Sequence, residues 1–126
     1  MSTLRVNNLT DTSGTAANLG IPGAAKAWVN FNGTGTVSIR ASYNVSSITD
    51  NGTGQYTINF TNAFSDTNYA ECFAMSGDTN GGNLIRSYLG ANEINKTTTS
   101  IEIQSLKAQD NNVADCAAIT ASFFGD

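Results

Sequence analysis

The groups in this chain that could do chemistry are ten carboxylates and many hydroxyl side chains, with no histidine to assist them. Two carboxylates at a defined separation, one of them in an apolar pocket, could cleave a glycosidic bond. Four of the aspartates stand among turn-forming residues, where aspartate commonly bonds to the local backbone. These are Asp50, Asp66, Asp78 and Asp110. A Ser-His-Asp triad cannot form without histidine, so we expect no catalytic residues and no enzyme.

Metal and cofactor sites are not expected either. Glu71, Glu102 and Asp115 fall in predicted strands among polar or small neighbours, which indicates solvated side chains. The segments 50–54 and 77–82 offer carboxylate, amide and backbone oxygens of the kind that suit a hard cation. Neither segment has the dense acidic spacing of a calcium loop, so the sequence predicts no metal and no cofactor.

The aromatic residues raise the alternative of a sugar-binding surface. Tyr43 and Tyr56 share their alternation with Ile and Val residues and are therefore predicted to point inward. Trp28 stands beside Val29 and Phe31, which favours a core or interface role over a sugar platform. The better candidates for an exposed ligand-binding edge lie further along the chain. They are Tyr88, Asp78, Asn80 and Asn83.

The two cysteines, Cys72 and Cys116, match no metal-binding spacing. Both fall in predicted strands, where buried thiols act as small apolar residues. A disulfide between facing strands is the alternative. The first residues lack the apolar core of a signal peptide, and a reducing cytosol favours thiols.

The surface is expected to be polar but sparsely charged. Charged residues make up 13% of the chain, about half of the ~25% usual for soluble domains. The net charge is −4, and the six basic residues are dispersed. Nucleic-acid binding needs clustered cations, so we expect no nucleic-acid partner. No apolar run approaches the ~20 residues of a membrane span, so no membrane partner is expected.

Apolar and polar residues alternate through much of the chain, as in antiparallel strands with one buried face. Tyr56, Ile58 and Phe60 alternate with polar residues, and so do Ile101 and Ile103. The strands are predicted at 26–31, 37–43, 45–48, 55–60, 69–75, 84–89, 98–106 and 113–124.

The last of these strands is apolar or small on both faces, unlike the others. That pattern indicates either a central strand covered on both sides or a strand at a subunit contact.

Short turns rich in Gly and Asn separate the strands, for example at 32–35 and 50–54. Together the strands and turns predict an all-β domain over residues 25–126, either an antiparallel β-sandwich or a jelly-roll-like barrel.

Residues 1–24 are predicted to form an extended N-terminal arm, because they contain three glycines and the only proline. Leu4, Val6 and Leu9 could form one short strand that docks on a neighbouring subunit or on a particle. A frayed terminus is the alternative.

Several stretches resemble a module of tail-fibre and related virion proteins of tailed bacteriophages, especially phages of cyanobacteria and marine bacteria. The resemblance spans AKAWVNFNGTGTV at 25–37, the hairpin SSITDNGTGQYTINF at 46–60 and NFTNAFSDTNYA at 59–70. The opening STLRVNNLTDTSG at 2–14 is also similar to the start of such proteins. Together these stretches cover about half of the chain.

This resemblance implies a β-rich domain on the virion surface that is commonly a homotrimer, without catalytic residues. The expected partners are further copies of the chain, other capsid or tail proteins, and, in the alternative of a receptor-binding module, a host surface glycan. The chain lacks the long shaft of a tail fibre, so a capsid decoration or cement protein is expected beside a fibre-type protein. It would fold in the host cytoplasm, since no signal peptide is evident.

Overall fold

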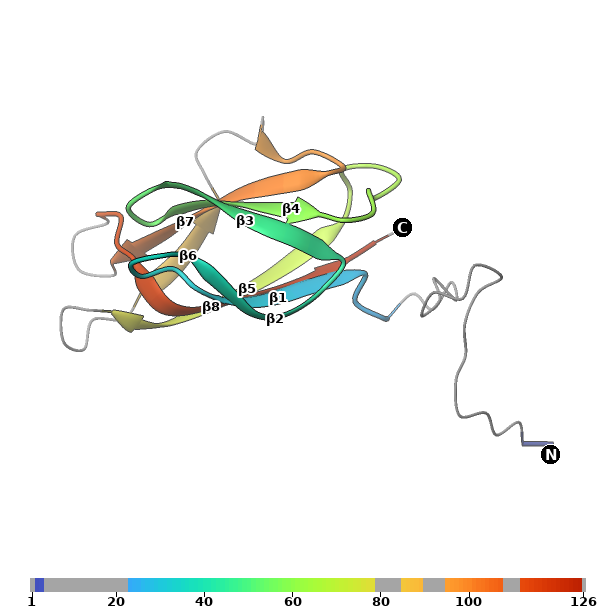
Figure 1. The fold of residues 1–126 in the computed structure, drawn as a ribbon. Coiled ribbons are helices and arrows are strands. Elements are labelled where there is room, and N and C mark those ends of the chain that lie inside the picture. The colour runs from blue at the N-terminus through green and yellow to red at the C-terminus, as the bar shows by residue number, and fades with distance from the viewer. Residues whose placement is uncertain (1, 4–22, 79–84, 90–94, 108–111, 126) are drawn as a thin grey trace.

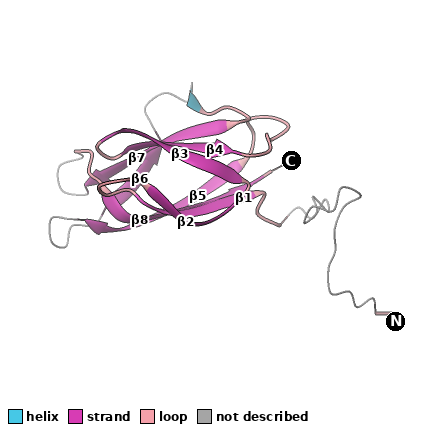
Figure 2. Ribbon diagram, in the orientation of Figure 1, coloured by secondary structure: helices cyan, strands magenta, loops and turns pink. Residues whose placement is uncertain are grey.

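The computed structural model describes residues 2–3, 23–78, 85–89, 95–107 and 112–125. Within this part of the chain, strands form two four-stranded sheets that pack face to face (Figures 1 and 2). The fold is therefore the predicted all-β antiparallel sandwich. In spatial order, sheet one contains β2 (Ser38–Tyr43), β1 (Ala27–Asn32), β8 (Cys116–Phe124) and β5 (Ala70–Asp78). Sheet two contains β3 (Val45–Gly52), β4 (Gln55–Phe60), β7 (Ser100–Lys107) and β6 (Ile85–Leu89).

The core lies between the sheets and follows the period-two pattern of the sequence. Tyr56, Ile58 and Phe60 of β4 are buried, while the residues between them are partly exposed. Ile101 and Ile103 of β7 are buried in the same way. Burying one face of each strand supplies the main stabilisation, at roughly 25 cal/mol per Å² of apolar surface.

One end of the sandwich is closed by aromatic rings. The Phe60 ring centroid lies 5.0 Å from those of Phe64 and Phe123, both in edge-to-face geometry. Tyr69 stacks on Phe64 at 4.3 Å, and its hydroxyl donates to the Thr97 carbonyl at 2.8 Å. The segment 59–70 thus serves as the hydrophobic lid of this end.

Strand β8 is central in sheet one, as one of the two predicted alternatives had it, but it is not covered on both sides as that alternative expected. It pairs with β1 on one side and with β5 on the other. Its buried residues Ile119, Ala121 and Phe123 face the core. Thr120, between two of them, is exposed on the outer face of sheet one. A subunit contact at this outer face stays a prediction.

Strand β2 differs from its predicted pattern because of a β-bulge. Phe31 pairs with Ile39 and Asn30 pairs with Ala41, so Arg40 is an extra residue without an opposite partner. One extra residue reverses the faces beyond it. Tyr43 consequently pairs with Trp28 on the outer face and is 38% exposed. The prediction that Tyr43 points inward is wrong, whereas Tyr56 is buried as predicted.

Asn44 turns the chain from sheet one into sheet two. Its φ is 55°, a left-handed conformation that asparagine tolerates better than most residues. The Asn44 side-chain amide donates to the carbonyls of Lys26 and Asn62, both at 3.1 Å. Its Oδ1 accepts the Asn62 backbone N–H at 2.7 Å. The corner therefore ties the start of the body to the segment that follows β4.

Most of the predicted arm, including Leu4, Val6 and Leu9, lies outside the described residues. Its docking role stays a prediction.

The β3–β4 hairpin provides a test of close packing between the two sheets. Gly54 has φ +65°, and a Cβ built on it would lie 2.6 Å from the Ala114 nitrogen. Gly35 has a similar φ of +59° but open space around it. We expect Gly54→Ala to lower the free energy of unfolding by about 3 kcal/mol or more, since steric overlap adds to backbone strain. Gly35→Ala should cost only about 1 kcal/mol.

Urea unfolding followed by circular dichroism measures both values. Equal losses at the two glycines would show that backbone strain alone acts at Gly54.

Candidate functional site

Two neighbouring aromatic side chains stand on the outer face of sheet one. Trp28 of β1 and Tyr43 of β2 are directly opposite residues in the antiparallel pair, so their side chains share one face. They are 40% and 38% exposed, respectively. Trp28 is therefore not a core residue, and that part of its predicted role is wrong.

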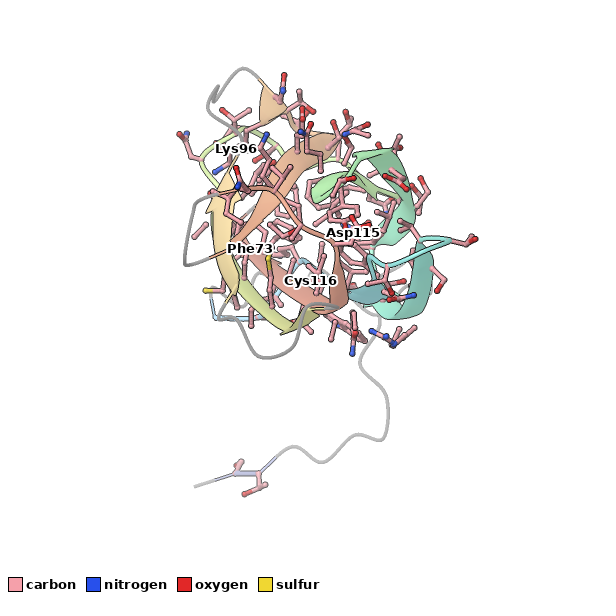
Figure 3. The ribbon with its side chains drawn as sticks, turned by 90° about the vertical axis from the view of Figure 1, so that its left-hand side faces the viewer. Phe73, Lys96, Asp115 and Cys116 are labelled. Carbon is pink, nitrogen blue, oxygen red and sulfur yellow. The ribbon has the colours of Figure 1, made fainter. Side chains whose placement is uncertain are left out.

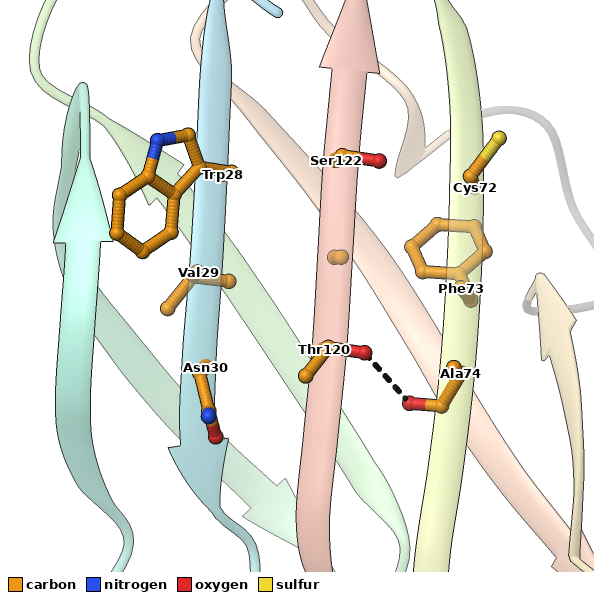
Figure 4. A pocket seen from close by; sticks show the side chains of 9 residues that line it. Trp28, Val29, Asn30, Cys72, Phe73, Ala74, Thr120 and Ser122 are labelled. Atoms are coloured by element: carbon orange, nitrogen blue, oxygen red, sulfur yellow. Dashed lines mark hydrogen bonds between the residues drawn. The ribbon is translucent and has the colours of Figure 1, made fainter.

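A groove of about 330 Å³ crosses this face from β1 over β8 to β5 (Figure 4). Its floor consists of inward-facing residues of the three strands, namely Val29, Ala121 and Phe73. Its walls come from the outward-facing residues of the same strands. These are Trp28, Asn30, Thr120, Ser122, Cys72 and Ala74. Within the groove, β8 contributes only the small outward side chains of Thr120 and Ser122, beside the larger Trp28 and Asn30 of β1.

The polar atoms of the groove are only partly engaged. The Thr120 hydroxyl donates to the Ala74 carbonyl at 3.3 Å. Asn30 Oδ1 accepts from the Arg40 guanidinium at 3.4 Å, and the same guanidinium donates to the Ala117 carbonyl at 2.6 Å. In the described part of the chain, Asn30 Nδ2 and Ser122 Oγ have no protein partner. The groove thus offers a donor and a hydroxyl to a ligand.

The predicted ligand-binding edge lies elsewhere and is only partly described. Asp78 ends β5, and Tyr88 belongs to β6 and pairs with Gln104. The two strands are the outermost strands of different sheets. Asn80 and Asn83 lie outside the described residues. The role of this edge stays a prediction, and the side chains that the structure does bring together are those of the outer-face groove.

The cysteines occupy different environments. Cys116 is buried as predicted, whereas Cys72 is exposed on the wall of the groove, which corrects its predicted burial. No disulfide joins them. Cys72 of β5 lies opposite Ser122 of β8, whereas Cys116 lies at the other end of β8, opposite Asp78. The two sulfurs are therefore too far apart for a disulfide bond.

Each carboxylate whose side chain is described has a hydrogen-bond or ion-pair partner in the protein. Asp50 and Asp66 accept backbone N–H groups two residues ahead, from Gly52 at 3.0 Å and Asn68 at 2.7 Å, as predicted for turns. Two others bind side chains: Glu71 forms an ion pair with Lys96 at 2.8 Å, and Glu102 accepts from Asn95. The predicted solvated role of Glu71 is therefore corrected to an ion pair.

Asp115 also departs from its predicted solvated role. It lies just before β8, at the end of the sandwich that Figure 3 views. Its Oδ1 accepts the Gly54 backbone N–H at 2.8 Å and lies 3.0 Å from the Tyr56 hydroxyl. The Tyr56 hydroxyl also lies 2.8 Å from the Gly33 carbonyl. Asp115 therefore connects the segment before β8 with the β3–β4 turn and, through Tyr56, with the turn at Gly33. The sequence alone gave no signal of this role, because the partners of Asp115 are distant in the chain.

The Tyr56 hydroxyl is held in its neutral form. Burial raises its pKa far above the ordinary value of 10, and the hydrogen bond and negative charge of Asp115 raise it further. Burial likewise raises the pKa of Tyr69, with a contribution from the charge of Glu71. Both groups act as structural donors rather than as acids at neutral pH.

Among the described residues, no three Cys, Asp or Glu side chains are grouped so that they could hold a metal ion. Within the same part of the chain, no helix has the length and apolarity to cross a bilayer.

The raised pKa of Tyr56 predicts a loss of stability in alkali. The unfolded chain releases the Tyr56 proton near pH 10, while the folded chain retains it, so the contribution of Tyr56 is complete below pH 10 and declines above it. Tyr56→Phe should cost about 1–3 kcal/mol at pH 7. The difference between the two proteins should then shrink by about 1.4 kcal/mol per pH unit above pH 10.

Urea unfolding of both proteins between pH 7 and 11 measures this difference, and other titrating groups cancel in it. A difference that stays constant up to pH 11 would contradict the assigned role of Tyr56.

No protein-family model, curated protein or solved structure matches the chain at a significant level.

Proposed function

We propose that this chain is a non-enzymatic structural protein on the surface of a bacteriophage virion. It acts as a capsid decoration or cement protein, or as a tail-fibre-type protein, and it assembles as a homotrimer. The virion role and the trimer come from the sequence resemblance. The structural use of the described carboxylates is consistent with a protein that does no chemistry.

The observation that carries the proposal is the unprotected edge of sheet one. β2 is the outermost strand of that sheet, and all six of its residues are exposed. Two of them are large and apolar, Ile39 and Tyr43, which are 37% and 38% exposed. Natural proteins normally blunt such an edge with lysine, proline or a covering segment. An edge with exposed apolar residues is suited to contact with another chain.

The one charged residue of β2 does not guard this edge. Arg40 folds back across the outer face and binds the Ala117 carbonyl of β8 and the Asn30 side chain of β1. The Arg40 guanidinium therefore lies over the outer face of sheet one and does not face a strand that approaches the β2 edge. The edge can bury Ile39 in a subunit contact without also burying an unpaired cation.

The arm at residues 1–24 is the second contact in this proposal. Its apolar positions Leu4, Val6 and Leu9 would dock on a capsid or tail protein, while the body supplies the contacts between subunits.

The solution mass tests the trimer. Native mass spectrometry across a dilution series should show a species of three 13.2 kDa chains. Ile39→Glu should convert it to a monomer, because a carboxylate at the contact loses its hydration without a partner. Thr53→Glu, at an exposed position of the β3–β4 turn, is the matched control and should leave the trimer intact. A monomeric wild-type protein at all concentrations would overturn the proposed assembly.

Removal of residues 1–22 tests the arm. The shortened chain should keep its unfolding transition, because the described body begins at Gly23. It should no longer sediment with virion particles, whereas the full chain should. Equal sedimentation of both proteins would exclude docking through the arm.

A further inference from the structure

We propose that the outer-face groove of sheet one binds a neutral saccharide, with Trp28 as its stacking platform. The inference does not depend on the virion role or on the trimer. It moves ligand binding away from the edge around Tyr88 to a site that spans β1, β8 and β5.

Trp28 has the geometry of a platform. In Figure 4 the indole ring lies over the β1–β2 side of the sheet and turns its flat face outward, with the second sheet behind. An exposed aromatic face attracts the apolar C–H face of a pyranose ring, because aromatic rings combine a large apolar area with a negative face. Leaving so large a ring exposed costs hydrophobic stabilisation, which a ligand would restore.

The walls of the groove supply hydrogen bonds of the kind that sugar hydroxyls need. Asn30 Nδ2 and Ser122 Oγ have no partner among the described residues, and the Thr120 hydroxyl makes only a long bond of 3.3 Å. Arg40 binds Asn30 Oδ1 at 3.4 Å, which leaves the Asn30 Nδ2 donor for a ligand. A hydroxyl can both donate and accept, so a saccharide satisfies such a mixed set.

The charge and size of the groove select a neutral ligand of a few rings. No charged side chain lines it, and the nearby guanidinium of Arg40 is already engaged by Asn30 and Ala117. The lining itself therefore gives an anionic ligand no ion pair to offset its lost hydration. The Arg40 guanidinium outside the lining keeps its charge, because its two acceptors are neutral. The volume of about 330 Å³ falls at the lower end of ligand sites, which span roughly 300–1,000 Å³.

A second copy of the chain fits this face less well. Four strands about 4.8 Å apart, with six residues at about 3.3 Å each, give a flat area of roughly 400 Å². A standard protein interface uses about 800 Å² on each partner. The face alone is therefore small for a stable dimer but ample for an oligosaccharide.

Fluorescence tests the proposal directly, because Trp28 is the only tryptophan of the chain. The full chain is titrated with neutral trisaccharides, namely maltotriose, cellotriose, mannotriose, galactotriose and chitotriose. At least one should shift the Trp28 emission in a saturable manner. Trigalacturonate, the anionic counterpart of galactotriose, should not.

Cys72 provides a second readout for variants that lack tryptophan. It is exposed on the groove wall, whereas Cys116 is buried, so a maleimide should label Cys72 first. The bound saccharide should slow this labelling. Trp28→Ala should weaken the protection about tenfold in saccharide concentration. Thr53→Ala, which truncates an exposed side chain outside the groove, is the control and should retain it.

Three results would overturn the proposal. One is the absence of any emission shift and of any Cys72 protection while circular dichroism shows a folded chain. Another is binding of trigalacturonate that is as tight as the binding of the neutral trisaccharides. The third is a concentration-dependent change in the Trp28 emission of Ile39→Glu without sugar, which would mean that a second copy covers the face even when the trimer contact is removed. Ile39→Glu should keep saccharide binding as a monomer, so failure of the groove and failure of the trimer are distinguishable.

Discussion

The pairing of β8 on both of its edges is the constraint on which the rest of the structure depends. It fixes the register of β1 and β5 at once and sends Phe123 into the aromatic cluster beneath the lid. Asp115 lies just before β8, and its carboxylate accepts the backbone N–H of Gly54 in the β3–β4 hairpin of sheet two. The outward β8 side chains Thr120 and Ser122 are small, and the groove lies over them. Core, loop contacts and binding surface therefore share one strand.

The sequence was sufficient to predict the strands whose two faces differ strongly in polarity. The β4 and β7 faces were predictable because burial of Tyr56, Ile58 and Ile101 needs only a period of two. The central position of β8 was one of two predicted alternatives. Small residues on both faces are typical of a central strand and also of a strand at a subunit contact. The sandwich was likewise predictable from strand number and turn spacing.

The candidate site was not predictable for a related reason. The bulge at Arg40 is a property of the β1–β2 pairing and not of either strand alone, so the outward direction of Tyr43 depends on a non-local register. Trp28 is the exception, because its position two residues before Asn30 places it on the polar face of β1 by local periodicity alone. Its apolar neighbours in sequence led to the wrong prediction of a core role. Asp115 finds its partners in Gly54 and Tyr56, which no local pattern reveals. Local periodicity determines strands, whereas the site is determined by how the strands meet.

The union of β1 with β8 joins segments from nearly opposite ends of the described chain, with Ala27 opposite Phe123. Closing so long a loop costs entropy before any contact compensates for it, and such pairings slow folding. The β3–β4 hairpin, by contrast, can form from neighbouring residues during synthesis. Sheet one cannot be completed until β8 has left the ribosome, and until then Val29 and Phe31 lack their neighbours. A nascent chain would therefore carry an unfinished apolar sheet until β8 has emerged, and a chain that ends before β8 is a natural target for chaperones and proteases.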